Sequence, residues 1–413
     1  MERYEAYKDG GWLGDVPSSW NLVRISSLYD SRNEKVSDKD YPPLSVTMQG
    51  ILPQLETAAK TQDGDNRKLV KKGDFAINSR SDRRGSCGIS QYDGSVSLIT
   101  NVLRPKDASG MDMRFFGHLF KSEKFSDEYF KQGTGIVDDL WSTNWSRMKN
   151  ILVCCPDLES QQAIADFLDE KTAEIDDIVS ETERSIELLR EYRKSVISEA
   201  VTKGLDPDAP MKDSGVEWIG EIPEGWACSK VKFAFVNRDS QRVPIESSLR
   251  KQSDGGLYPY YGASGVVDYI DEYIFDEPLL LIGEDGANLR LRNLPIVYLA
   301  EGKYWVNNHA HILQPDACIL LKYAAFLLEL ADLENFLTGT TMPKLTQENL
   351  GNIPVVLPSL GEQKQIVDYL DTKTAEIDAL IADKEKQVEL LKEYRKSLIS
   401  EAVTGKFKVP GVS

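Results

Sequence analysis

A basic cluster in the first third of the chain combines side chains that can bind phosphates and base edges. Its members are Lys68, Lys71, Lys72, Asn78, Arg80, Arg83 and Arg84. Arginine and lysine neutralise phosphates, and arginine can also donate two parallel hydrogen bonds to the O6 and N7 atoms of guanine. An exposed charged loop without a ligand has the same composition. The cluster by itself therefore leaves DNA contact and a plain surface loop both open.

Two polar segments in the second half of the chain carry a different set of candidates. One is Gly283–Asn288 and the other is Trp305–His311. The candidate residues within them are Asn288, Asn307, Asn308 and His309, and Tyr261 and Lys344 are further candidates outside the two segments. Asparagine can bond both edge groups of adenine, and a carboxylate can accept a hydrogen bond from the amino group of cytosine. A polar turn with a buried Asn/His network is the structural alternative here.

The sequence offers little for catalysis or for metal binding. It contains three histidines, His118, His309 and His311, and five cysteines that form no C-x-x-C pair. His309 and His311 have a spacing that could place both on one strand face, but no Cys or His spacing completes a metal site. We find no phosphate-binding loop of the G-x-x-x-x-G-K type, no G-x-G-x-x-G loop and no nucleophile–base pair. These absences predict a protein with no catalytic residues and no metal of its own.

The same features indicate the cellular setting. The cysteine pattern is typical of a reducing compartment without a disulfide framework. The N-terminus, starting at Met1, is polar and acidic, and apolar runs such as Leu279–Ile282 are far shorter than the ~20 residues that a membrane span needs. We therefore expect a cytoplasmic protein that does not contact a membrane.

The candidates lie on two variable blocks within a duplicated frame. Residues 156–202 align without gaps to 358–404, with 28 identities in 47 positions, and the nine residues from Trp12 return from Trp218 as W-[L/I]-G-x-[V/I]-P-x-x-W. Residues 21–150 and 227–351 lie between these motifs and share little obvious sequence. The chain thus reads as short motif, variable block and long motif, twice over.

Each long motif has the period of a helix. Apolar residues from Ile164 to Val196 follow spacings of three, four and seven, and the second copy repeats them. Prolines precede each run, and Gly204 and Gly405 are expected stops. A single stripe about 40 residues long must be buried against a partner. We predict that the two helices form an antiparallel intramolecular coiled coil with pseudo-twofold symmetry; separate packing of each helix on its own domain is the alternative.

The variable blocks look like small α+β domains. Strands are expected in 69–78 and 277–283, and a helix in Lys322–Phe336. The predicted organisation is a first α+β domain with its entry segment (1–155), a central helical spacer (156–204), a second α+β domain with its entry segment (205–357), a C-terminal helical spacer (358–405) and a tail (406–413).

Charge is distributed unevenly over this frame. The whole chain has 49 basic and 66 acidic residues and a net charge of −17, which taken alone argues against nucleic acid. Residues 21–150, however, have 20 lysines and arginines against 17 acidic residues, and 227–350 have 11 against 16. Most of the acidity lies on the helical frame, so the total charge does not exclude DNA contact by the blocks.

These motifs together resemble the specificity (S) subunit of type I restriction–modification enzymes, over nearly the whole chain. The W-[L/I]-G-x-[V/I]-P-x-x-W segments are similar to the entry into each target-recognition domain of that family. The P-x-L-x-x-Q segments at 156–161 and 358–363, and the L-L-x-E-Y-R-K-S-x-I-S-E-A-V-T segments at 188–202 and 390–404, are similar to its repeated helices.

The resemblance implies a fold and a mechanism. Two target-recognition domains would each read one half of a bipartite double-stranded DNA sequence. The helices would set the gap between the half-sites and carry two methyltransferase subunits, which methylate adenine with S-adenosylmethionine. The complex could also include two restriction subunits, which use ATP and Mg²⁺. This chain would bind no cofactor itself. Four extra residues in a helix would add roughly 6 Å of length, nearly two base pairs.

Two alternatives remain open at this point. The chain could be a protein–protein scaffold whose acidic coiled coil docks partners without sequence-specific DNA binding. It could also serve a related enzyme in which one polypeptide both methylates and cuts. Duplex binding that falls steeply with salt would argue against the scaffold; only the partner's sequence would separate the other two.

Overall fold

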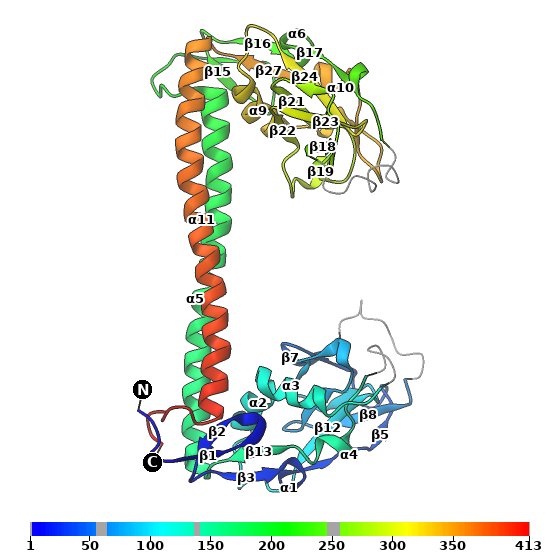
Figure 1. Cartoon of the computed structure of the whole chain (residues 1–413), viewed down its shortest axis with the longest axis vertical. Helices are drawn as coiled ribbons and strands as arrows, with labels where there is room; N and C mark the ends of the chain where they lie inside the picture. The colour runs from blue at the N-terminus through cyan, green and yellow to red at the C-terminus, as the bar shows by residue number, and fades with distance from the viewer. Residues whose placement is uncertain (1, 55–63, 136–140, 246–256, 413) are drawn as a thin grey trace. The chain divides into compact units, whose positions relative to one another are not determined.

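The computed structural model describes residues 2–54, 64–135, 141–245 and 257–412. The chain divides into two compact units, which we describe separately. Unit 1 comprises Met1–Glu183 with Glu385–Ser413, and unit 2 comprises Arg184–Lys384. The division falls within both long helices, α5 (Leu158–Lys203) and α11 (Leu360–Val403), so that each unit contains a part of each helix (Figure 1). No helix in the described residues has both the length and the hydropathy needed to cross a membrane.

Unit 1 is built on an antiparallel four-stranded sheet. Its strand order is β10 (Cys87–Ile89), β9 (Phe75–Asn78), β12 (Thr100–Pro105) and β4 (Tyr29–Ser31). A second sheet has the order β11 (Gly94–Val96), β8 (Arg67–Val70) and β5 (Lys35–Val36). The paired short strands are β1 (Tyr7–Asp9) with β2 (Asp15–Pro17), β3 (Asn21–Arg24) with β13 (Leu152–Cys155), and β6 (Leu44–Thr47) with β7 (Gly50–Pro53). The short helices are α1 (Ile25–Leu28), α2 (Met113–Lys121), α3 (Glu123–Lys131) and α4 (Trp145–Met148).

Unit 2 repeats this plan although its sequence differs. Its main sheet has the order β22 (Val297–Ala300), β21 (Leu279–Gly283), β24 (Ala310–Pro315) and β17 (Phe235–Asn237), also antiparallel. The second sheet has the order β19 (Gly265–Ile270), β18 (Tyr258–Gly262), β23 (Lys303–Val306) and β20 (Phe275–Asp276). The paired short strands are β14 (Met211–Asp213) with β15 (Glu221–Pro223), β16 (Ala227–Lys230) with β27 (Pro354–Leu357), and β25 (Leu337–Thr338) with β26 (Lys344–Leu345). The short helices are α6 (Val231–Ala234), α8 (Asn288–Leu291), α9 (Leu321–Leu330) and α10 (Gln347–Asn352).

The glutamine of the repeated P-x-L-x-x-Q motif fastens each domain to its long helix. Gln161 and Gln363 are buried, and the amide nitrogen of each donates to the carbonyl of the proline five residues before it. The Oε1 atom of Gln161 accepts from the backbone N–H of Asp112, at 2.9 Å, where α2 begins. Gln363 accepts in the same way from Leu320, at 2.7 Å, where α9 begins. The motif thus positions the first domain helix against the long helix in both units.

The entry segments pack against the glycines that follow the long helices. α5 ends at Lys203 and α11 at Val403, and Gly204 and Gly405 have φ angles of 78° and 67°. Glycine adopts this left-handed conformation without steric cost. A Cβ atom on Gly204 would meet the Trp226 ring at 3.1 Å, and one on Gly405 would meet the Pro17 ring at 2.5 Å and the Trp20 ring at 3.0 Å. Both stops were predicted, and these contacts with the entry segments explain why each site also requires a small residue.

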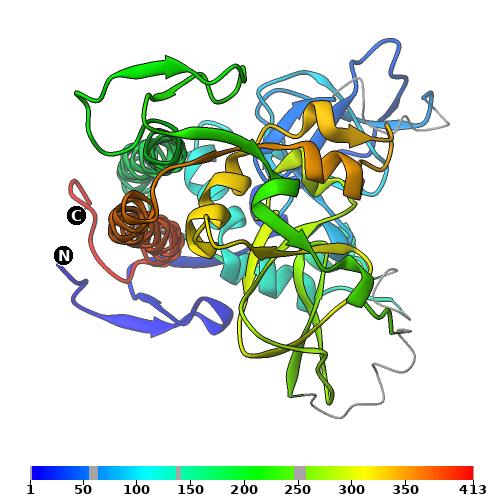
Figure 2. The same ribbon diagram turned by 90° about the horizontal axis from the view of Figure 1, so that it is seen from above.

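The two long helices lie side by side within each unit (Figures 1 and 2). In unit 1, Asp176 pairs with Arg395 and Glu183 pairs with Lys392, each at 2.8 Å. As residue numbers rise along α5 they fall along α11, so the segments run antiparallel there. The chain ends also meet in unit 1, where the backbone N–H of Lys408 donates to the carbonyl of Glu2 at 2.7 Å.

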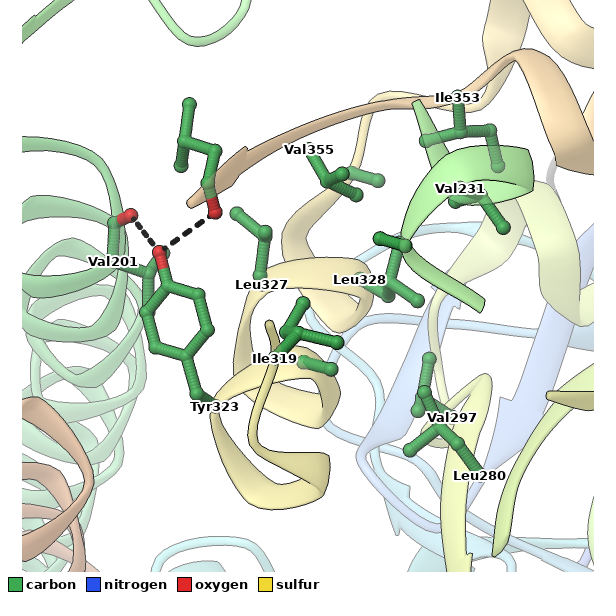
Figure 3. Packing of buried hydrophobic residues seen from close by; sticks show 14 of the residues in the cluster. Val201, Val231, Leu280, Val297, Ile319, Tyr323, Leu327, Leu328, Ile353 and Val355 are labelled. Atoms are coloured by element: carbon green, nitrogen blue, oxygen red, sulfur yellow. Dashed lines mark hydrogen bonds between the residues drawn. The ribbon is translucent and has the colours of Figure 1, made fainter. Parts of the chain in front are cut away.

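The main core of unit 2 fills the space between α9, the sheet and the long helices. Tyr323 of α9 is fully buried, and its hydroxyl lies 3.0 Å from the carbonyl oxygen of Val201 and 3.3 Å from that of Val356 (Figure 3). Leu327 and Leu328 of the same helix belong to the same buried cluster as Val355 of β27 (Figure 3). Burial of such side chains contributes about 1.5–3 kcal/mol each. The helix predicted over Lys322–Phe336 ends earlier, at Leu330.

Candidate nucleic-acid interface

The loop after β9 carries three exposed arginines, Arg80, Arg83 and Arg84. We define edge 1 as residues 78–85 together with 141–143. The Oδ1 atom of Asn78 accepts from the backbone N–H of Arg80 at 3.1 Å, which turns the chain out of the sheet. Arg84 pairs with Asp127 and lies over the Phe130 ring, 4.9 Å from its centroid. Arg84 therefore anchors the loop, and Asp127 already neutralises part of its charge.

Arg80 and Arg83 are the available cations of edge 1. Both are exposed. Arg83 has one ion-pair partner among the described residues, Asp82 at 3.7 Å, and both side chains of that pair are more than half exposed. Arg80 has no ion pair within the described parts of the chain. Exposed arginines held on a short loop can approach a duplex with little desolvation cost.

The loop after β21 occupies the matching position in unit 2. We define edge 2 as residues 283–288 together with 307–309 and 343–345. Asp285 forms an isolated β-bridge with Lys344, as Arg80 does with Ser142 in edge 1. The Nδ1 atom of His309 lies 2.8 Å from the carboxylate of Asp285. Asn308 and His309 are exposed at this edge.

A buried polar side chain supports each edge from the same place in the sheet. Asn101 of β12 lies opposite Ile77 of β9 in the sheet, and His311 of β24 lies opposite Ile282 of β21. The amide of Asn101 donates to the carbonyl of Thr143 at 2.7 Å, and the Nε2 atom of His311 lies 2.8 Å from the carbonyl of Leu345. These carbonyls belong to the segments that complete the edges. The two edges are therefore built on the same backbone arrangement, which we call the edge frame.

The same frame carries different chemistry in the two units. In unit 1 it borders a pocket of about 450 Å³. The pocket is lined by Asn33, Lys68, Ser79, Leu98, Ile99, Asn101, Asn144, Trp145 and Ser146. In unit 2 the residues at the sheet positions of Asn33, Ser79 and Asn101 are ionisable: Asp239, Glu284 and His311. Neutral amides and a hydroxyl in one domain thus correspond to an ionic network in the other.

That network is buried and internally paired. Asp239 Oδ2 lies 2.6 Å from Nδ1 of His311, and Glu284 pairs with Arg242 and, at 3.0 Å, with Lys344. Burial would raise the pKa of Asp239, but its bonds to His311 and the backbone and the charge of Arg242 outweigh that effect and lower it. The pKa of Glu284 is lowered in the same way, because hydrogen bonds from Arg242 and Lys344 outweigh its burial.

Three of these groups have the types and spacing of a metal site. Ligand atoms of Asp239, Glu284 and His311 lie within 4.8 Å of one another, a cluster that the sequence spacing did not reveal. Both ring nitrogens of His311 already face acceptors, and Arg242 contacts both carboxylates. The internal ion pairs account for the arrangement, and we assign no metal to it.

We expect Asp239→Asn to destabilise unit 2 by about 3 kcal/mol, because it removes the buried carboxylate that contacts His311 and accepts from the Ile312 N–H, and leaves Arg242 with Glu284 alone as its counter-charge among the described residues. The lowered pKa values of Asp239 and Glu284 mean that their stabilisation is present above about pH 4 and is lost as the pH falls through the folded-state values. Urea unfolding between pH 3 and 7 measures both effects. An unchanged midpoint at pH 7 would show that the network contributes nothing; Asp271→Asn, at an exposed position just after β19, is the matched control.

Several predicted DNA-binding residues lie elsewhere or have structural partners. Burial lowers the pKa of Lys68, whose ammonium donates to the Thr100 carbonyl at 2.6 Å. Asn288 closes its own loop by donating to the carbonyls of Leu294 and Pro295. Lys71 and Lys72 are exposed in the turn between β8 and β9, Asn307 is buried, and Tyr261 is half-buried in β18. Their contact with DNA stays a prediction.

The structure adds candidates that the sequence reasoning passed over. Ser79, Ser142 and Asp285 lie on the edges, and Arg242 and Asp239 support edge 2 from outside the recognised motifs. Ser142 and Arg242 are more than 40 residues from the loops that they meet. Asp285 does lie within a recognised motif, and its position just after a strand could have marked it as a candidate.

Comparison with known proteins identifies the family. The model of the type I restriction modification DNA specificity domain matches the chain twice, at residues 17–188 and 223–390. Each match includes one variable block and the first part of one long helix. The chain belongs to the type I restriction–modification DNA specificity family. The two variable blocks of this family member share a sheet order without obvious sequence similarity.

Relatives within the type I specificity family cover either a part or nearly all of the chain. A specificity subunit of Haemophilus influenzae is 36% identical over 137 residues, 33% of this chain and 34% of that protein. The MjaVIII specificity subunit of Methanocaldococcus jannaschii is 24% identical over 430 residues, 96% of this chain and 95% of the relative. The second match extends over nearly the full length of both chains.

Solved structures of the family show the same fold. A chain from a structure of the type I restriction–modification system, concerned with its complex assembly and conformational transition, has a TM-score of 0.72 at 15% identity, and the match covers 95% of this chain and 99% of that one. The HsdS subunit of Thermoanaerobacter tengcongensis has a TM-score of 0.54 at 16% identity, with 95% and 98% covered. At this identity the likeness establishes the fold alone.

Proposed function

We propose that this chain is the non-catalytic specificity subunit of a type I restriction–modification complex and reads a bipartite double-stranded DNA target. The single observation that carries the proposal is the pair of edges. They share one backbone frame, yet the side chains that they present differ at nearly every position. A frame held constant while its exposed residues vary suits two readers of dissimilar half-sites.

The chemistry of the edges suits base readout. Arg80 and Arg83 of edge 1 are donors without a strong internal partner, which favours guanine or phosphate contacts. Edge 2 presents Asn308, the His309–Asp285 pair and Lys344, a mixture of donors and acceptors. The two half-sites should therefore differ in sequence and in the kind of contact that selects them.

The long helices serve, in this proposal, as an antiparallel coiled-coil spacer that sets the gap and docks two methyltransferase subunits. Interhelical ion pairs and the buried apolar stripe support this role. The partner subunits would bind S-adenosylmethionine, and restriction subunits, where present, would bind ATP and Mg²⁺. This chain would supply recognition and spacing and no reacting group.

Selection from random duplex DNA tests the proposal. The chain would be purified with the methyltransferase that co-purifies from its host, and bound duplexes would be sequenced. We expect a two-part motif with a constant gap. No enrichment, from a complex shown to be folded and complete, would favour the protein scaffold instead.

Arg83→Ala should weaken recognition at one half-site only, by about 1–3 kcal/mol if the guanidinium bonds a base. Because Arg83 is exposed, we expect the variant to stay folded, which a thermal melt checks. Affinity would be measured on duplexes altered in one half-site at a time. A uniform loss on all duplexes would assign Arg83 to phosphate, and Arg84→Ala, which breaks the Asp127 anchor, serves as the comparison.

A further inference from the structure

Unit 2 contains a pocket of about 660 Å³ that lies apart from edge 2. Residues of α5, α8, β22 and α9 line it, and none of its lining residues belongs to edge 2. Its apolar walls include Ile197, which is buried, and Leu299 and Phe326, which are half-buried. Charged side chains, among them the exposed Lys194, also line it. Proteins bind small organic molecules in concave sites of about 300–1,000 Å³ that combine apolar walls with a few polar groups. The pocket has the size and the apolar walls of such a site.

Lys194, on the α5 wall of the pocket, differs from its counterpart in the internal repeat. That counterpart, 202 residues later, is Lys396 of α11 in unit 1. The ammonium of Lys396 lies 2.8 Å from the carboxylate of Glu123, the first residue of α3. Lys194 has no ion pair within the residues that the structure describes. The duplicated frame thus carries the same lysine twice, and among the described residues only the copy in unit 1 meets a carboxylate.

The difference can be traced to one position in the domains. In each unit, the glutamine of the P-x-L-x-x-Q motif binds the backbone N–H of the residue before a domain helix, Asp112 before α2 and Leu320 before α9. Eleven residues after Asp112 the chain has Glu123, and eleven residues after Leu320 it has Ala331. Ala331 lines the pocket, and residues 331–346, all of them described, contain no α-helix that corresponds to α3. A methyl group therefore stands where unit 1 has a carboxylate, and the pocket lies beside it.

The other charged groups that line the pocket have partners of their own. Three lining cations form ion pairs: Arg193 with Asp378, Arg290 with Glu334, and Lys322 with Asp371. Arg292 donates to three backbone carbonyls instead. Of the remaining lining carboxylates, Glu329 accepts from the backbone N–H groups of Ile296 and Val297, and Asp332 accepts from that of Glu334. Among the described residues, Lys194 is thus the lining charge whose hydrogen bonds are all left to solvent or to a ligand.

We propose that this pocket binds a small organic acid, with its carboxylate on Lys194 and its apolar body against Phe326 and Leu299. The carboxylate takes the place beside Lys194 that Glu123 takes beside Lys396. A hydrogen bond between an ammonium and a carboxylate is stronger than one between neutral groups. The apolar body removes from water the half-buried side chains of the pocket wall. The site needs neither edge, so ligand binding does not depend on DNA recognition.

Ligand-observed NMR titration of the full chain, alone and co-purified with its methyltransferase, tests the site. The probe is 5-phenylpentanoate, and 5-phenyl-1-pentanol is the matched uncharged probe. We expect the acid to bind both preparations with a dissociation constant of about 1 mM or lower, and the alcohol to bind about 10-fold more weakly, because it lacks the charged acceptor. Lys194→Met should weaken binding of the acid about 10-fold and leave that of the alcohol unchanged. Lys396→Met, the repeat-related control, removes the pair with Glu123 and should bind the acid as the native chain does.

Four results would contradict a carboxylate site in this pocket. Equal binding of the acid by the native chain and by Lys194→Met would place the acid elsewhere. Equal binding of the acid and the alcohol would leave an apolar site without selectivity for a carboxylate, and no binding of either probe would remove the site altogether. Binding to the chain alone that is lost in the complex would assign the pocket to an acidic side chain of the partner. Both lysines are exposed, so we expect both variants to fold, which circular dichroism melts check.

Discussion

Replacement of residues 227–350 with the corresponding block of another family member is expected to change one half of the DNA target and leave the other intact. The structure makes this graft feasible because both junctions lie close to a single two-stranded ladder. β16 begins at Ala227 and pairs with β27, so that Ala227 lies opposite Leu357 and Lys230 opposite Pro354. The first junction falls at the start of β16 and the second within α10, shortly before β27, and the buried Trp226 that packs on Gly204 stays in place.

The size of the effect is a complete change of preference at one half-site, since every residue of edge 2 lies within the graft. Selection from random duplexes measures it. The reciprocal graft of 21–150 is the matched control, because β3 and β13 close that block in the same way, with Asn21 opposite Cys155. A change in both half-sites after either graft would show that the two blocks do not read DNA independently.

Lengthening both long helices by seven residues is expected to widen the gap by about three base pairs. Two helical turns add about 10.5 Å, and a base pair rises 3.4 Å. Seven residues also keep the heptad spacing of the buried stripe, so the helices can still pair. Insertion after Glu183 and after Lys384 places the new residues between the Glu183–Lys392 and Arg193–Asp378 ion pairs.

Selection from random duplexes with variable gaps checks this result, and both half-site sequences should stay the same. Insertion into α5 alone is the control: it puts the apolar stripe out of register with α11 and should lower stability and abolish the two-part motif. An unchanged gap in the doubly extended chain, with normal affinity, would mean that something other than helix length sets the spacing.

The secondary structure followed from local sequence where tertiary contacts did not override it. The runs 69–78 and 277–283 do contain strands, but the first holds two, because Asp74 accepts from the Lys71 N–H and pairs with Arg32 at a turn between β8 and β9. The helix predicted to reach Phe336 stops at Leu330. Arg292 donates to the carbonyls of Glu329 and Ala331 there and caps the helix from a distant loop.

The duplicated frame, the long helices with their glycine stops and the location of the basic cluster can be predicted from the amino-acid sequence, because each depends on local period, spacing or residue type. Which side chains form the edges depends instead on contacts between segments that are far apart in the chain. Asn101 and His311 share no residue type and no recognisable motif, yet each binds the carbonyl that fixes its edge. The equivalence of the two readers lies in strand order and backbone hydrogen bonding, which side chains of very different chemistry can satisfy.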